Sequence, residues 1–132
     1  MKTHILDANA LMTFFEDRPG AALVEELLAK ASETQTPLLM SVVNWGEVYY
    51  SIWRIRGEAV ANEKLRHIAQ LPIKIVDADL ELTRLAASLK AAHGLPYADC
   101  FGAALAQSRK ADLITGDRDF ARIESVVKIV WL

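Results

Sequence analysis

Four carboxylates in this sequence stand where they could act together on one ligand. Asp7 ends the first short apolar run, and Asp117 follows a second such run in the same way. Glu47 and Asp99 come early in segments with helical periodicity that follow loops. In open parallel sheets, ligands bind beyond the carboxyl ends of the strands. We therefore expect all four acids to converge on one edge of a sheet.

Clustered carboxylates repel one another unless a cation neutralises them. Two unpaired carboxylates about 4 Å apart repel by ~4 kcal/mol at an effective dielectric of about 20. Oxygen ligands without clustered His or Cys favour Mg²⁺ or Mn²⁺ over zinc. Such an ion, with its bound waters, suits the hydrolysis of phosphodiesters. The four acids therefore predict a Mg²⁺ or Mn²⁺ site.

Each acid also has an ordinary structural explanation. Asp99 would favour a helix N-terminus, Asp117 a turn, Asp7 a strand end, and Glu47 a solvated helix face. None of the four indicates a site alone. Their joint placement favours the metal site.

The histidines and the cysteine offer no rival chemistry. His4, His67 and His93 lack partners at metal-ligand or catalytic-triad spacing, so structural or surface roles are expected. Cys100 lies in an apolar helical segment and is expected to pack there. As the only cysteine, it can form no internal disulfide, and a reducing cytosol fits best.

Short apolar runs alternate with helical segments along the chain. Strands are predicted at 4–6, 37–43, 73–76, 112–115 and 126–131. Helices are predicted at 21–31, at 58–70, at 79–93, from Asn44 as an N-cap, and from Pro96, with a turn at 116–120. Strands separated by helices imply right-handed crossovers. The predicted fold is α/β, with a mostly parallel central sheet of four to five strands flanked by helices.

The composition is that of one ordinary globular domain. Hydrophobic residues make up 52% and charged residues 24% of the 132 positions, which argues against disorder. The length suits a single domain over residues 1–132. Because no apolar run approaches the roughly 20 residues of a membrane span and no export signal is visible, we expect a cytoplasmic protein without a membrane anchor.

Any contact with nucleic acid must be local. The net charge is −2, so the chain lacks the overall basic character of a non-specific nucleic-acid binder. Two stretches carry basic residues that offer such a contact or simply solvate the surface: Arg54, Arg56, Lys64 and Arg66, and Arg109, Lys110, Arg118 and Arg122.

Four motifs follow one another along the chain in the order ILDANALM, NWGEVYY, LPYADCFGAALA and LITGDRDF. Together they resemble the PIN-domain nucleases, most closely the VapC toxins of bacterial and archaeal toxin–antitoxin modules. The resemblance spans nearly the whole chain. It implies a three-layer α/β fold, metal-dependent endonuclease cleavage of RNA, inhibition by a cognate antitoxin protein, and a homodimer.

The same resemblance assigns roles to individual residues. Asp7 and Asp99 match the aspartates most firmly tied to the metal, and Glu47 and Asp117 match the remaining acids. Thr115 matches a hydroxyl residue that supports the site. Beyond these, Asp119 is a weaker addition, and Asn9, where many relatives carry Ser or Thr, is expected to support the metal ligands by hydrogen bonding.

An aromatic cluster on the Glu47 helix allows two interpretations. Trp45, Tyr49, Tyr50 and Trp53 follow helical spacing, which is most simply the pattern of a core face. The alternative is an apolar groove for an antitoxin helix or a homodimer face. Tyr50 and Trp53 are the residues expected to be exposed.

Two other functions compete with the nuclease. A phosphatase of the haloacid dehalogenase type also begins with a strand-end aspartate, but it needs a second acid two residues later, where this chain has Asn9. A metal-free module that binds RNA or protein on the same fold would tolerate neutralisation of Asp7 or Asp99. The sequence does not name the RNA, its cleavage position or the number of metal ions.

Overall fold

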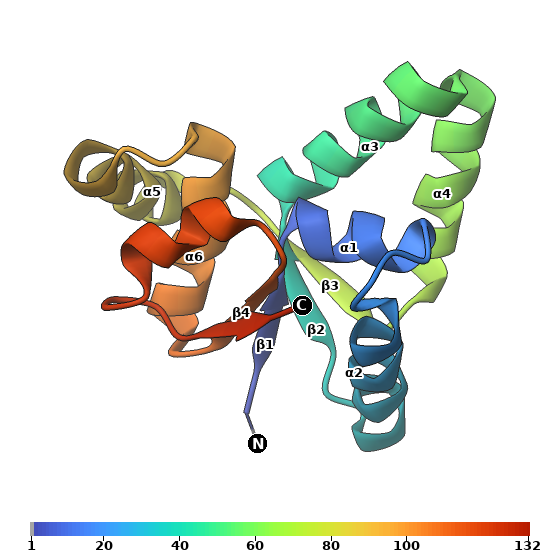
Figure 1. Ribbon diagram of the computed structural model, residues 1–132, viewed down its shortest axis with the longest axis horizontal. Coiled ribbons are helices and arrows are strands. Elements are labelled where there is room, and N and C mark those ends of the chain that lie inside the picture. The colour runs from blue at the N-terminus through green and yellow to red at the C-terminus, as the bar shows by residue number, and fades with distance from the viewer. Residues whose placement is uncertain (1) are drawn as a thin grey trace.

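A five-stranded sheet forms the centre of the computed structural model, which describes residues 2–132 (Figure 1). Its order is β3-β2-β1-β4-β5, and every neighbouring pair is parallel. The strands are β1 (His4–Leu6), β2 (Leu38–Ser41), β3 (Ile73–Val76), β4 (Asp112–Thr115) and β5 (Ile129–Trp131). The predicted α/β class is confirmed, and the sheet is wholly rather than mostly parallel.

Helices cover both faces of the sheet. On one face lie α1 (Ala8–Phe15), α2 (Ala21–Thr34), α3 (Val42–Arg56) and α4 (Glu58–Gln70). On the other lie α5 (Leu80–His93), α6 (Tyr97–Arg109) and the 3₁₀ helix η1 (Arg118–Ile123). Figure 1 shows the hairpin of α3 and α4 extending away from the sheet. The result is the three-layer arrangement that the sequence predicted.

The central strands are buried on both sides because consecutive side chains point to opposite faces. Ile5 and Leu113 pack into the core under α5 and α6. Their neighbours Leu6 and Ile114 pack into the core under α1 to α4. This explains why the strands have continuous apolar runs without polar alternation.

One helix was missed, and two local predictions were wrong. Residues 8–15 form α1, which no element of the sequence analysis covered. The Glu47 helix starts at Val42 with Ser41 as its N-cap, so Asn44 lies inside the helix and does not cap it. The predicted turn at 116–120 runs into η1, which delays the last strand to Ile129. The helix at 58–70 and the strand at 73–76 are confirmed, and the helix predicted at 79–93 runs from Leu80 to His93 with Asp79 as its N-cap.

Within residues 2–132, each helix is too short or too polar to cross a lipid bilayer.

Candidate metal centre

Asp7 lies buried at the junction of β1 and α1, with both carboxylate oxygens hydrogen-bonded. It is the N-cap of α1, where its Oδ1 accepts from the backbone N–H of Ala10 at 2.8 Å. Its Oδ2 accepts from the Thr115 hydroxyl on β4 at 2.6 Å. The pKa of Asp7 is raised to about 7. Burial is the main cause, repulsion from Asp99 and Asp117 adds to it, and the two hydrogen bonds oppose it. The carboxylate is therefore held in place but poorly neutralised.

Hydrogen bonds also hold the loop after β4 close to Asp7. The Asp117 backbone N–H donates to the Thr115 hydroxyl at 3.0 Å. The Gly116 N–H donates to Asn9 Oδ1 at 2.7 Å. Asn9 thus contacts the backbone of the loop after β4 and not, as expected, the side chain of an acid. A Cβ at Gly116 would lie 3.1 Å from Asn9 Oδ1, so glycine permits this close approach.

Three aspartates bring their side chains together beside Asp7. Carboxylate oxygens of Asp99, Asp117 and Asp119 all lie within 4.8 Å of one another. Asp99 sits in the first turn of α6, and Asp117 accepts a hydrogen bond from the Asp119 N–H at 3.0 Å. Burial raises the pKa of Asp99 to about 7, helped by repulsion from Asp117, Glu47 and Asp119. Asp119, treated above as a weaker addition, is therefore a full member of this cluster.

Glu47 approaches the cluster from α3. Its side chain is half-buried, and its Oε1 accepts a hydrogen bond from Asn44 Nδ2 at 2.8 Å. Burial raises the pKa of Glu47, the Asn44 hydrogen bond opposes that rise, and the charge of Asp117 adds to it. The charge of Asp117 thus acts on both Glu47 and Asp7, but of the four predicted acids the structure brings Asp99 and Asp117 within 4.8 Å of each other, together with Asp119, and not Asp7 or Glu47.

Among the described residues, no basic side chain forms an ion pair with this group. Among residues 2–132, the ion pairs involve Glu16, Glu81 and Asp112 but none of the five acids at this corner. Neighbouring carboxylates without an ion-pair partner are a donor set that fits a hard divalent ion. Asp7, Glu47, Asp99, Asp117 and Asp119 are the residues that could hold it.

The family follows from comparison with known proteins. The model of the family described as PIN domain matches residues 4–126, which is most of the chain. The chain belongs to the PIN-domain family. Comparison with curated protein sequences gives no match.

Solved structures share the architecture of this PIN domain. VapBC2 from Rickettsia felis, bound to a DNA fragment from its promoter, has a TM-score of 0.74 at 19% identity over 97% of each chain. DNA-bound VapBC from Salmonella typhimurium has a TM-score of 0.75 at 17% identity over 98% of each chain. VapC20 from Mycobacterium tuberculosis, a sarcin-ricin loop cleaving toxin, has a TM-score of 0.71 at 13% identity over 89% of this chain and 92% of its own. At these identities the likeness establishes the fold.

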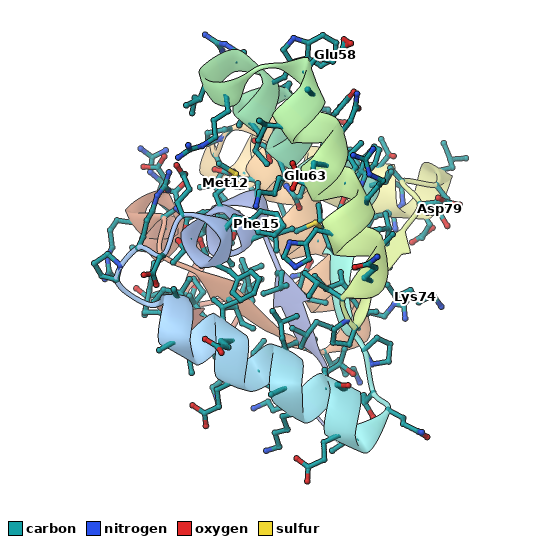
Figure 2. The ribbon with its side chains drawn as sticks, turned by 90° about the vertical axis from the view of Figure 1, so that its right-hand side faces the viewer. Met12, Phe15, Glu58, Glu63, Lys74 and Asp79 are labelled. Carbon is teal, nitrogen blue, oxygen red and sulfur yellow. The ribbon has the colours of Figure 1, made fainter. Side chains whose placement is uncertain are left out.

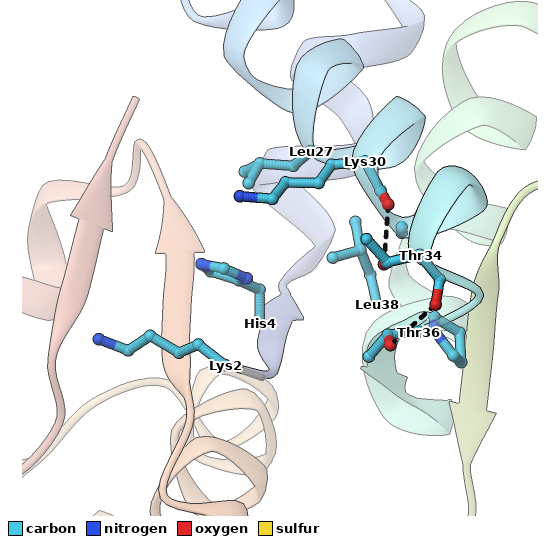
Figure 3. A pocket seen from close by; sticks show the side chains of 9 residues that line it. Lys2, His4, Leu27, Lys30, Thr34, Thr36 and Leu38 are labelled. Atoms are coloured by element: carbon cyan, nitrogen blue, oxygen red, sulfur yellow. Dashed lines mark hydrogen bonds between the residues drawn. The ribbon is translucent and has the colours of Figure 1, made fainter.

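Two hollows of this PIN domain lie away from the carboxylates. One, of about 280 Å³, is formed by α1, α3 and α4, and Figure 2 shows Met12 and Phe15 of α1 beside Glu63 of α4 within it. The other, of about 160 Å³, lies at the start of β1, where Lys2, His4 and Lys30 line it (Figure 3). Neither hollow contains an acid of the cluster, so neither is part of the candidate metal centre.

Proposed function

We propose that this PIN domain, residues 1–132, is a metal-dependent endoribonuclease that acts as the toxin of a toxin–antitoxin pair. The observation that carries the proposal is the corner of five acids without a protein cation. Unneutralised carboxylates held close together oppose folding, so their convergence favours a function that brings a cation.

The proposed metal is Mg²⁺ or Mn²⁺, held by Asp7, Glu47, Asp99 and Asp117, with Asp119 at the rim. When bound, such an ion neutralises phosphate charge and activates a water molecule for hydrolysis. The chain's own part is to orient the ligands. The Thr115 hydroxyl donates a hydrogen bond to Asp7 Oδ2 and accepts one from the Asp117 N–H, so one hydroxyl holds two of the acids in place.

RNA is the proposed substrate, and two arginines that follow Asp117 in the chain support it. Arg118 and Arg122 lie exposed on η1, directly after Asp117. Arg118 lies over the Trp131 ring, with 4.4 Å from its Cζ to the ring centroid, which limits the motion of its guanidinium. Guanidinium groups suit phosphate oxygens next to a cleavage site. A similar fold occurs in a toxin that cleaves the sarcin-ricin loop, a structured RNA.

The proposed partner is a cognate antitoxin, which would use the hollow between α1, α3 and α4. Several similar structures are toxin–antitoxin complexes. The hollow combines apolar side chains with charged ones at its rim, which suits an amphipathic segment. Tyr50 and Trp53 on α3 are 52% and 43% exposed, as the sequence analysis expected. We also propose a homodimer, since two-fold dimers are the commonest assembly of soluble proteins.

The test is cleavage of a panel of structured cellular RNAs, including transfer RNAs, by the purified protein with Mg²⁺, with Mn²⁺ and with EDTA. The proposal expects cuts at defined positions with either metal, none with EDTA, and none with Asp7→Asn. A folded, metal-binding protein that leaves every RNA intact would favour the alternative function, a module that binds RNA or protein without cleaving it.

A further inference from the structure

Asn44 lies fully buried between two of the acids. It lies in the first turn of α3, three residues before Glu47, and none of its surface is exposed. Its Nδ2 donates to Glu47 Oε1 at 2.8 Å and to the backbone oxygen of Ala98 at 3.1 Å. Ala98 immediately precedes Asp99 in the first turn of α6. One amide group therefore links the helix of Glu47 to the helix of Asp99.

The orientation of this amide is fixed by its surroundings. A side-chain amide has two donor hydrogens, and both are used here. The flipped amide would place its oxygen against the Glu47 carboxylate and the Ala98 carbonyl, which are both acceptors. The observed orientation is therefore the one in which Asn44 stabilises both neighbours.

Asn44 Oδ1 has no hydrogen-bond partner among residues 2–132, although it is buried. An unpaired buried acceptor costs about 1–3 kcal/mol, so the side chain is not optimised for stability alone. A Cβ at Gly102 would lie 3.1 Å from this oxygen. Glycine at this point of α6 thus lets the two helices approach closely enough for the amide to reach Ala98.

We propose that Asn44 is a positioning residue that holds Glu47 and the Asp99 turn in the geometry required for the divalent ion. This inference rests on the proposed function. Glu47 has several rotatable bonds and is repelled by Asp117, and within residues 2–132 the Asn44 amide is the one side chain that donates a hydrogen bond to it. Without that bond, repulsion would move the Glu47 carboxylate toward solvent.

The test uses two variants and a matched control. Asn44→Ala removes the side chain, and Asn44→Leu removes both hydrogen bonds while keeping a similar volume and eliminating the unpaired oxygen. Val48→Ala is the control, because Val48 is buried one turn further along α3 in the apolar core. The measurement is Mn²⁺ affinity of the purified proteins by electron paramagnetic resonance, with thermal unfolding recorded for each.

Both Asn44 variants are expected to bind Mn²⁺ roughly 10–100-fold more weakly, as for other residues that orient metal ligands. Val48→Ala is expected to lose stability but to keep its affinity within about twofold. In a Glu47→Ala background, the effect of Asn44→Ala should shrink, because one of its two targets is gone. Unchanged affinity in Asn44→Leu, or an equal effect in both backgrounds, would overturn the proposal.

A crystal structure of metal-free Asn44→Leu provides a readout that needs neither metal nor activity. The Glu47 carboxylate should leave its position near the first turn of α6, and an unmoved Glu47 and Asp99 would overturn the positioning role. If the unmodified protein neither binds Mn²⁺ nor cleaves RNA, the proposed function fails, while this structure still decides the role of Asn44.

Discussion

Asp112 and Asp7 are both buried aspartates on the central sheet, but they lie at its opposite ends and have opposite surroundings. Asp112 begins β4, and its Oδ2 lies 3.1 Å from Lys2 Nζ and 3.9 Å from Lys128 Nζ. Asp7 follows β1 and takes part in no ion pair among the described residues, while Asp99 and Asp117 act on it by repulsion.

The contrast separates a structural acid from a functional one. At the amino end of the strands, the chain supplies its own cations to a single carboxylate. At the carboxyl end, it gathers five carboxylates, and within residues 2–132 none of them forms an ion pair with a basic side chain. Natural proteins break local rules of stability mainly at functional sites. The missing positive charge is therefore the feature that indicates an external cation.

The largest expected difference is between the variant that neutralises Asp7 and the variant that neutralises Asp112. Asp7→Asn should reduce RNA cleavage by more than about 100-fold, since ligands should matter more than the residues that orient them. Asp112→Asn should leave cleavage within about twofold and lower stability by about 1 kcal/mol, because its lysine partners are largely exposed. Initial cleavage rates and thermal unfolding check both variants. Equal losses of cleavage would remove the distinction between the two ends.

Thr115→Val tests how the acid corner is held together. The change removes the hydroxyl that donates to Asp7 and accepts from Asp117, so cleavage should fall about 10–100-fold and stability by about 1–3 kcal/mol. Thr13→Val is the control, because Thr13 is buried in α1 without a hydrogen bond to any of the five acids. A cleavage loss of similar size in Thr13→Val would mean that the effect is only destabilisation.

The raised pKa values predict how metal-free stability depends on pH. Asp7 and Asp99 have pKa values of about 7 in the folded protein against 3.8 in the unfolded chain, so the folded state binds more protons between these values. Stability should therefore fall as pH rises from about 4 to 7, by about 2–3 kcal/mol between pH 5 and pH 8 for the buried Asp7 and by less for the half-buried Asp99, where solvent screens the charge. Saturating Mn²⁺ should restore stability at pH 8.

Denaturant unfolding at each pH measures this loss, and Asp99→Asn supplies the reference. Burial lowers the pKa of His4, which acts in the opposite direction at acid pH, and the difference between the two proteins cancels that contribution. The difference curve should show the unmodified protein losing stability as pH rises. A flat difference curve would mean that ionisation of Asp99 does not destabilise the folded protein.

The smallest effect is expected from a change outside both ends of the sheet. Trp53→Ala on α3 should weaken binding of the proposed antitoxin by about tenfold, because exposed tryptophans often anchor interfaces. RNA cleavage and the unfolding temperature should stay unchanged. Calorimetric titration checks the affinity, and the same affinity in Trp53→Ala would exclude this face from the antitoxin interface.

Apolar periodicity was sufficient to predict the layered fold. The runs at 4–6 and 112–115 became neighbouring buried strands, and the helix at 58–70 has the predicted bounds. Periodicity missed α1 because this helix is short and its residues 8–15 are mostly apolar. Its start also depends on Asp7 acting as N-cap. That carboxylate was assigned to a metal site, and its second role became visible only in the structure.

The acids were predictable as a group, but their contacts were not. Strand ends and helix starts bring Asp7, Asp99 and Asp117 to one edge for any parallel sheet of this kind. Asn44 has the right residue type for an N-cap, yet Ser41 caps the helix and the close approach of Gly102 buries Asn44. Such a contact joins residues more than 50 positions apart, and no local pattern reports it.

The most direct test of the metal centre is diffraction from crystals of the unmodified protein soaked in Mn²⁺, recorded at the manganese absorption edge. The account predicts an anomalous peak within coordination distance of the Asp7, Asp99 and Asp117 carboxylates, and no peak there in Asp7→Asn crystals. Crystals with open access to this corner that show no peak, or a peak only at Asp112 on the other end of the sheet, would contradict it.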